Sequence, residues 1–344
     1  MATDYDPALS AWSTYLPRVG LTPAQVPALL SAEAYSRTRL TRARERLAEL
    51  EHRSAEFEAC AVFALGSLGR MEASEQSDLD LAFLFDSKRV SRPRAEQLRA
   101  EVLARLEPTF DIPQKTFARA VDLRALTRNI GGREDTNVTL TYRALLLTEG
   151  AWLAGTGRDF KRAVFAAYTA GQIARGRFLT ALANDLHRYY RTLCMDYRYK
   201  VEELDKSWAI RVLKLRHSRK LWHLANIALQ CWAVEAIEDD AERDVVLAAR
   251  VGWPSLLRLS LALDAFDAPE LAREPLLCFD RFLAALARPE VRDALMTLPH
   301  AQRESCEAYE ELRLNAERLD LANTRVVELL FERCRPFLVR FCLL

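Results

Sequence analysis

The chain has 344 residues, half of them apolar, and a formal net charge of +1. This length supports one large domain or two ordinary ones. Because the net charge is close to zero, overall electrostatics does not indicate any class of partner. No apolar run reaches membrane-spanning length and the N-terminus lacks a signal pattern, so we expect a cytoplasmic protein without membrane insertion.

The predicted elements change character along the chain. Helical spacing of leucines predicts a helical arm up to residue 58, and short apolar runs predict buried strands over 60–65 and 79–85. A helix over 92–106, a third strand over 115–122 and a helix over 137–150 follow, and nearly every segment beyond residue 160 has helical periodicity. We therefore expect an α+β protein with an N-terminal helical arm (1–58), a small domain of strands and helices (59–157) and a helical bundle (158–344).

A glycine-containing turn follows the first predicted strand. Gly66 and Gly69 allow backbone torsions and close approaches that a β-carbon would block. Ser67 adds a hydroxyl and Arg70 a cation, and backbone N–H groups at such a turn can face an anion. We expect this turn to hold the phosphates of a nucleoside triphosphate.

Two carboxylates stand where the second predicted strand begins. Asp78 and Asp80 are two residues apart, so they share one face of an extended strand. Such a pair beside a phosphate site can hold two divalent ions about 3.5–4 Å apart. Oxygen ligands favour Mg²⁺ or Mn²⁺.

These residues, Gly66-Ser67-Leu68-Gly69-Arg70-Met71-Glu72 followed after five residues by Asp78-Leu79-Asp80, resemble the signature of the DNA polymerase β-like nucleotidyltransferase superfamily. The pattern is most similar to a bacterial subgroup that includes the uridylyltransferase of nitrogen regulation and its uncharacterised relatives. The resemblance implies that residues 59–157 form a polymerase β-like catalytic domain with a mixed sheet and a third metal-binding carboxylate on a neighbouring strand. Asp122 is the preferred residue for this role, Asp111 is the second choice and Asp135 the third.

The bundle contains a basic, aromatic stretch over 188–220. Ten Lys and Arg residues stand there against four acids, with four tyrosines and Trp208 between them. This composition suits a nucleotide base and its phosphates, or else a solvated helix whose tyrosines pack inward. Similarity to polymerase β-like enzymes, many of which place a lysine and a serine against the triphosphate, implies nucleotide binding by Lys214 and Ser218.

Together these features predict an ATP-binding or related nucleotidyltransferase that moves a nucleoside monophosphate to a hydroxyl and releases pyrophosphate. The sequence does not decide whether the hydroxyl acceptor is a protein, an RNA or an oligonucleotide. A partner protein that belongs to the same system is a further expectation. One alternative is an oligonucleotide or signal-nucleotide synthase of bacterial antiviral defence, primed by a protein hydroxyl such as that of Tyr5 or Ser10. The other alternative is an inactive nucleotide-sensing or antitoxin-like module.

Overall fold

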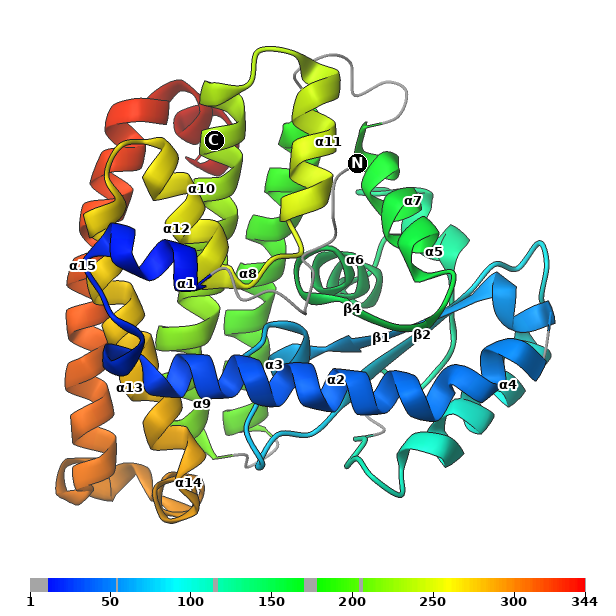
Figure 1. The fold of residues 1–344 in the computed structure, drawn as a ribbon, viewed down its shortest axis with the longest axis horizontal. Coiled ribbons are helices and arrows are strands. Elements are labelled where there is room, and N and C mark those ends of the chain that lie inside the picture. The colour runs from blue at the N-terminus through cyan, green and yellow to red at the C-terminus, as the bar shows by residue number, and fades with distance from the viewer. Residues whose placement is uncertain (1–11, 54, 114–116, 170–177, 204–206, 344) are drawn as a thin grey trace. The chain divides into compact units, whose positions relative to one another are not determined.

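The structure is a computed structural model that describes residues 12–53, 55–113, 117–169, 178–203 and 207–343. Its described residues form two compact units (Figure 1). The sheet unit comprises residues 33–178 with 252–254, and the bundle unit comprises residues 1–32, 179–251 and 255–344. The division therefore falls at residues 32/33 and 178/179, whereas the sequence predicted boundaries at 58 and 157.

The sheet unit alternates helices with four short strands. Its elements are α2 (Pro27–Arg53, from residue 33 onward), a 3-10 helix (Ala55–Ala59), β1 (Cys60–Leu65), α3 (Gly66–Gly69), β2 (Asp80–Phe85), α4 (Arg92–Leu106), β3 (Val121–Asp122), α5 (Leu123–Thr127), α6 (Asn137–Glu149), β4 (Ala151–Gly155) and α7 (Gly157–Thr169). The strands predicted over 60–65 and 79–85 and the helices predicted over 92–106 and 137–150 are confirmed within one residue.

The four strands form one mixed sheet in the order β3-β2-β1-β4. β1 is antiparallel to both β2 and β4, and β2 is parallel to β3. All six residues of β1 are buried, as are the last five of β2, which explains their continuous apolar sequences. The strand predicted over 115–122 is reduced to Val121 and Asp122, while residues 115 and 116 lie outside the described residues.

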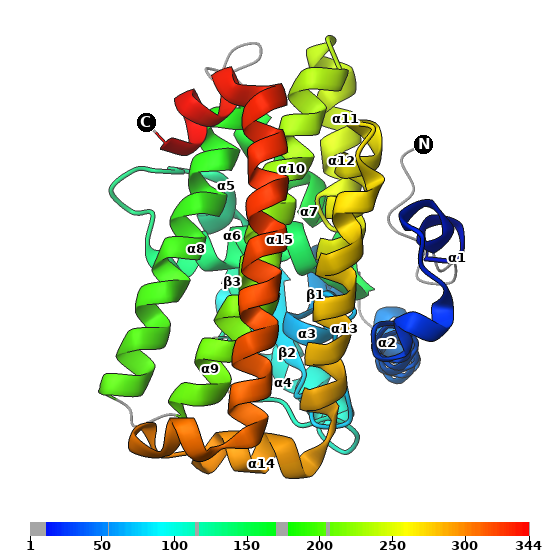
Figure 2. The ribbon, with the colours of Figure 1, turned by 90° about the vertical axis from the view of Figure 1, so that its left-hand side faces the viewer.

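All the regular secondary structure in the described residues of the bundle unit is helical. Its elements are α1 (Trp12–Tyr15), 3-10 helices (Leu16–Val19, Pro23–Gln25, Pro269–Ala272, His300–Ser305), α8 (Phe178–Glu202), α9 (Trp208–Lys214), π-helical turns (Leu215–Arg219, Leu338–Leu343), α10 (Lys220–Ala236), α11 (Asp240–Arg250), α12 (Ser255–Ala265), α13 (Arg273–Ala287), α14 (Pro289–Thr297) and α15 (Glu307–Phe337). The long helices α8, α10, α12, α13 and α15 run along a common direction (Figure 2). This arrangement confirms the expected C-terminal helical region.

The core of the bundle unit contains aromatic and polar side chains together. His217 stacks on Phe282 with ring centroids 4.4 Å apart, and Trp222 is fully buried against Tyr189.

No helix in the described part of the chain is both long and apolar enough to cross a membrane.

Candidate active site

The candidate site begins where β1 ends and the chain turns sharply. Gly66 has a φ of 68°, a left-handed conformation that favours glycine. A β-carbon at Gly66 would clash with Oδ2 of Asp80, which lies opposite Leu65 on the neighbouring strand. The turn and the Asp80 carboxylate are therefore in direct contact, as the sequence pattern predicted.

Hydrogen bonds close this turn after a single helical turn. The N–H of Met71 donates to the carbonyl of Leu68 (3.2 Å), and the N–H of Glu72 donates to the carbonyl of Ser67 (2.8 Å). This pair of bonds is the Schellman arrangement, in which the residue after the helix adopts a left-handed conformation. Met71 occupies that position with a φ of 61°, although glycine is the usual residue there. The backbone strain at Met71 means that surrounding contacts must hold the turn in place.

Those contacts come from a buried carboxylate that the sequence analysis missed. Glu149, the last residue of α6, is 1% exposed and accepts hydrogen bonds from the Gly66 N–H (3.2 Å) and from Nη1 of Arg70 (2.5 Å). Nε of Arg70 donates to Glu72 (2.8 Å). Gly69 packs so closely on the carbonyl of Glu149 that a β-carbon there would also clash.

These contacts change the role expected for Arg70. Its side chain is 6% exposed and lies between two carboxylates, those of Glu72 and Glu149. A guanidinium neutralised in this way stabilises the turn, and the contacts do not favour the phosphate-binding role predicted from the sequence. The Gly66 N–H, likewise expected to face phosphate, donates to Glu149. The only sequence signal for Glu149 is a charged residue in the apolar run of α6, just before Gly150.

Asp78 and Asp80 flank a buried residue at the start of β2. Leu79 is 1% exposed, whereas Asp78 is exposed and Asp80 is half-buried. This alternation is what extended backbone produces when two acids share the face opposite an apolar side chain. Within the described residues the Asp78 carboxylate has no hydrogen bond or ion pair.

Asp122 lies far from this pair, so the preferred choice for the third carboxylate was wrong. Asp122 stands opposite Phe85, at the far end of β2 from Asp80, and five strand residues span about 16 Å. Its carboxylate accepts the Arg124 N–H (3.1 Å) and the Ser87 N–H (3.4 Å), which makes it the N-cap of α5. The sequence pattern indicated a strand that ends at Asp122, but that end of β3 lies beside Phe85 and not beside Asp80.

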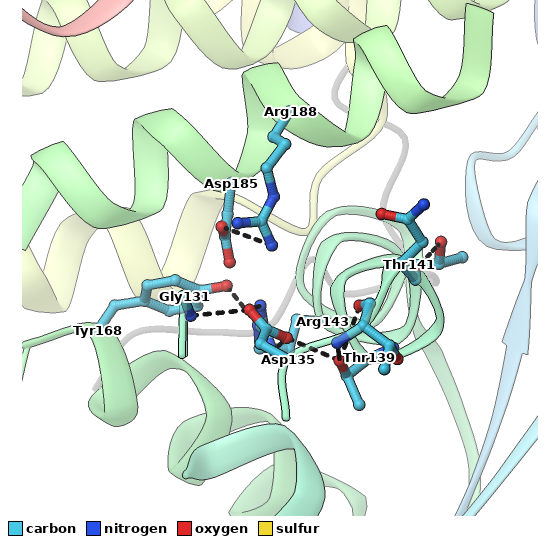
Figure 3. A network of polar contacts seen from close by, with 10 residues as sticks. Gly131, Asp135, Thr139, Thr141, Arg143, Tyr168, Asp185 and Arg188 are labelled. Carbon is cyan, nitrogen blue, oxygen red and sulfur yellow. Dashed lines mark hydrogen bonds and ion pairs between the residues drawn. The ribbon is translucent and has the colours of Figure 1, made fainter. Parts of the chain in front are cut away.

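The two alternatives for the third carboxylate have different surroundings. The carbonyl of Asp111 accepts the Leu79 N–H (2.8 Å), so the backbone of Asp111 adjoins the segment that carries both site acids. Asp135 is instead held by Arg143 in a two-point ion pair, with both N–O distances at 2.8 Å (Figure 3). Of the three candidates, Asp111 is the one whose backbone lies beside the site.

The network around Asp135 is structural. Oδ1 of Asp135 also accepts from the Thr139 hydroxyl (2.7 Å), and Oδ2 accepts from the Gly131 N–H (2.8 Å). Arg143 is fully buried and donates through Nε to the Tyr168 hydroxyl (2.9 Å). Burial disfavours the charged form of Asp135, but the donors on Arg143, Thr139 and Gly131 outweigh it and hold its pKa below the usual range.

The described residues fit divalent-metal binding by a pair of acids. No group of three or more His, Cys, Asp or Glu side chains in the described part of the chain is arranged to hold a metal ion. Mg²⁺ commonly uses one or two carboxylates and completes its coordination with waters and substrate phosphates. The chemistry of Asp78 and Asp80 at the glycine turn is compatible with that mode of binding.

Three aromatic side chains of the 188–220 stretch pack on other rings of the bundle unit. Tyr190 stacks on His223 with ring centroids 4.2 Å apart, and Trp208 contacts Tyr309 at 4.9 Å. Tyr189, as described above, packs on Trp222. Tyr189, Tyr190 and Trp208 therefore pack inward, which is the alternative that the sequence left open, whereas Tyr199 is exposed.

The predicted nucleotide-binding pair of the bundle lies at a change of helical geometry. Lys214 is the half-buried last residue of α9, and Ser218 is 5% exposed within the π-helical turn that follows. Arg216 and Lys220, which neighbour them, both form ion pairs with Asp320, at 3.0 and 2.6 Å. Tyr5 and Ser10, the predicted acceptor hydroxyls, lie outside the described residues.

Comparison with known proteins adds one family match. The model of a family described as "Putative nucleotidyltransferase DUF294" matches residues 21–113, which contain the glycine turn, Asp78, Asp80 and Asp111. Neither a curated protein nor a solved structure matches the chain. The family match supports nucleotidyl transfer as the general activity and a nucleotide as the substrate.

Proposed function

We propose that this protein transfers a nucleoside monophosphate from a nucleoside triphosphate to a hydroxyl acceptor and releases pyrophosphate. The observation that supports this most strongly is the contact between the Asp80 carboxylate and Gly66, at the end of β1 where the glycine turn begins. In the reaction the acceptor oxygen forms a bond to the α-phosphorus. The bond from the α-phosphorus to the oxygen that bridges the α- and β-phosphates breaks, pyrophosphate leaves, and the acceptor proton passes to solvent.

Asp78 and Asp80 are the residues that would hold Mg²⁺ or Mn²⁺ for this reaction. When bound, such ions activate the attacking hydroxyl and neutralise the charge that develops on the leaving pyrophosphate. The half-buried carboxylate of Asp80 and the exposed carboxylate of Asp78 supply the negative charge for this binding.

The glycine turn would position the phosphates. The Ser67 side chain is half-buried and forms no hydrogen bond within the described residues, so its hydroxyl is free to donate to a phosphate oxygen. Gly66 and Gly69 let the backbone approach closely, and Glu149 with Arg70 keeps the turn in one conformation. Asp111 is proposed as the third carboxylate because its backbone adjoins Leu79.

The direct test is incubation with each α-labelled nucleoside triphosphate and Mg²⁺, followed by gel analysis and intact mass. Asp78→Ala and Asp80→Ala should each lower transfer by ~10³-fold or more, because loss of a metal carboxylate removes several kcal/mol of transition-state stabilisation. Asp86→Ala is the matched control, since Asp86 directly follows the opposite end of β2. Parent-level transfer by either site variant would contradict the proposal.

The same assay separates the open products. Label on the protein indicates a protein acceptor, whereas a ladder indicates polymerisation. We further propose that Lys214 and Ser218 contribute to nucleotide binding, so Lys214→Ala should raise the apparent KM for the triphosphate and Ser218→Ala should raise it less. Lys200→Ala is the control, because Lys200 is paired with Asp196 at 2.6 Å. An unchanged KM in both variants at low salt would rule out this contribution.

A further inference from the structure

The β3 edge of the sheet unit carries a cluster of cations from three segments. We call it the basic edge and define it by Lys88, Arg92, Arg119, Arg124, Arg128 and Arg133. Contacts within the unit bring the segments together. Nη1 of Arg92 donates to the carbonyl of Ala120 (3.3 Å), next to Arg119, and the Ser87 N–H donates to Asp122 (3.4 Å), next to the start of α5.

All six of these side chains are exposed, and within the described residues none of them forms an ion pair. Other arginines of the same unit do have carboxylate partners. Arg94 pairs with Glu56 at 2.6 Å and Arg105 with Glu49 at 2.9 Å. The basic edge is therefore a place where positive charge is left uncompensated on the surface.

The acids near the basic edge accept hydrogen bonds from neutral groups: two accept from backbone N–H groups, and Glu134 accepts from the side-chain amide of Asn129 (3.0 Å). Asp122 accepts the N–H groups of Ser87 and Arg124, and Asp86 accepts the N–H of Lys88 (3.0 Å). Segments 86–92 and 119–134 together contain seven cations against three carboxylates. The local field is thus positive although the whole chain is nearly neutral.

The loop that carries Arg133 is held by hydrogen bonds within the unit. Its residues Asn129 and Gly131 have left-handed φ values of 56° and 75°, and the Gly132 N–H donates to the carbonyl of Asn129 (2.7 Å). The ion pair of Asp135 with the buried Arg143 anchors the loop, because Asp135 also accepts the Gly131 N–H (Figure 3). A cation on an ordered loop loses less conformational entropy when it binds a ligand.

The chemistry of the basic edge favours phosphate over a protein partner. Five of its six cations are arginines, whose planar guanidinium groups can bind phosphate through two hydrogen bonds. Among the described residues of 86–133 no large apolar side chain is exposed, so the surface lacks the apolar anchors that protein interfaces use. It also lacks exposed aromatic rings there, so contact with the backbone of a nucleic acid is favoured over base stacking.

The basic edge and the glycine turn are joined by α6. The loop with Arg133 precedes the N-terminus of α6, and Glu149 at its C-terminus contacts Gly66. The 13 residues of this helix span about 20 Å. A nucleic-acid strand of several nucleotides can cover that distance.

We propose that the basic edge binds the phosphate backbone of a nucleic acid and thereby presents a nucleic-acid hydroxyl as the acceptor. The binding itself needs no catalysis, whereas the acceptor role rests on the proposed function. The phosphodiester backbone is common to RNA and DNA, and the 2′-hydroxyl is what distinguishes them.

The test is fluorescence anisotropy with a labelled RNA hairpin, a single-stranded RNA and a DNA hairpin, in the Asp80→Ala background so that no transfer intervenes. We expect binding that weakens on the order of 10²-fold between 50 and 200 mM salt, as about four phosphate contacts require. Arg124→Glu with Arg128→Glu should weaken binding at least tenfold at low salt and reduce the slope of log affinity against log salt by about two.

Arg42→Glu with Arg162→Glu is the matched control, because both residues are exposed in the same unit and outside the basic edge. The proposal would be overturned if the two double variants bound equally well. It would also be overturned if the Asp80→Ala protein bound none of the three probes at 50 mM salt. Binding to phosphatidylserine vesicles without binding to the three nucleic acids would also overturn it and indicate a membrane surface. Nucleic-acid binding in a protein that shows no transfer would count against the proposed function alone. Thermal melting of each variant checks that it is folded.

Discussion

Asp80 lies against Gly66 across the pairing of β1 with β2, and its Oδ2 occupies the space that a β-carbon of residue 66 would need. The glycine therefore has two requirements to meet at once. It adopts a φ of 68° and it leaves room for the carboxylate. The site depends on this contact, because any side chain at position 66 displaces Asp80.

Gly66→Ala is predicted to abolish nucleotidyl transfer and to lower the free energy of unfolding by more than the ~1–2 kcal/mol of left-handed backbone strain alone. Gly131→Ala separates the two effects. Gly131 has a φ of 75°, but a β-carbon there would meet nothing within 4 Å. It should show the strain alone and retain transfer. Thermal melts and the labelling assay measure both, and equal activity losses in the two variants would contradict the role of the Asp80 contact.

Glu149→Gln is predicted to destabilise the sheet unit by ~3–5 kcal/mol, because it leaves the buried Arg70 without one of its carboxylates. Arg70→Gln should have a similar effect, and the double variant should lose much less than the sum. Arg313→Gln is the control, since its pairs with Glu310 and Glu317 lie on the surface, where solvent screening leaves ion pairs with little effect on stability. Chemical denaturation measures these values. Additive losses from Glu149→Gln and Arg70→Gln would show that the two groups do not act together.

Asp111→Asn is predicted to reduce transfer at least tenfold, whereas Asp122→Asn should transfer like the parent. Asp111 adjoins Leu79 through its backbone, while Asp122 caps α5 at the other end of β2. Asparagine is also a good N-cap, so Asp122→Asn should remain stable. Initial rates under saturating triphosphate compare the two, and the reverse order of activities would restore Asp122 as the third carboxylate.

The Asp135–Arg143 pair is predicted to make stability depend on acid pH. The folded-state pKa of Asp135 is held below its unfolded value of about 3.9, so its contribution is complete above that pH. The contribution is lost as the pH falls further, through the folded-state pKa. Asp135→Asn should lose stability at pH 7 and lose less additional stability than the parent between pH 5 and pH 3. Denaturation curves across this range measure it, and parallel pH profiles would contradict the assignment.

Local patterns in the sequence were sufficient to predict the strands Cys60–Leu65 and Asp80–Phe85, the helices Arg92–Leu106 and Asn137–Glu149, and the helical C-terminal region. Periodicity and glycine position act within a few residues, so they predict such elements well. The short segment between β1 and β2 also explains the contact of the glycine turn with Asp80, because it joins two strands that pair directly with each other.

Contacts between residues distant in sequence were decided by tertiary structure alone. Glu149 is 79 residues beyond Arg70, and no local pattern indicates that a carboxylate at the end of α6 would neutralise the arginine of the turn. Asp122 was placed at the wrong end of β2 because alternation predicts a strand but not which end of its neighbour it meets. Strand order, register and burial arise from packing across the whole unit, and they determine which carboxylates lie beside the site and which charges remain on the surface.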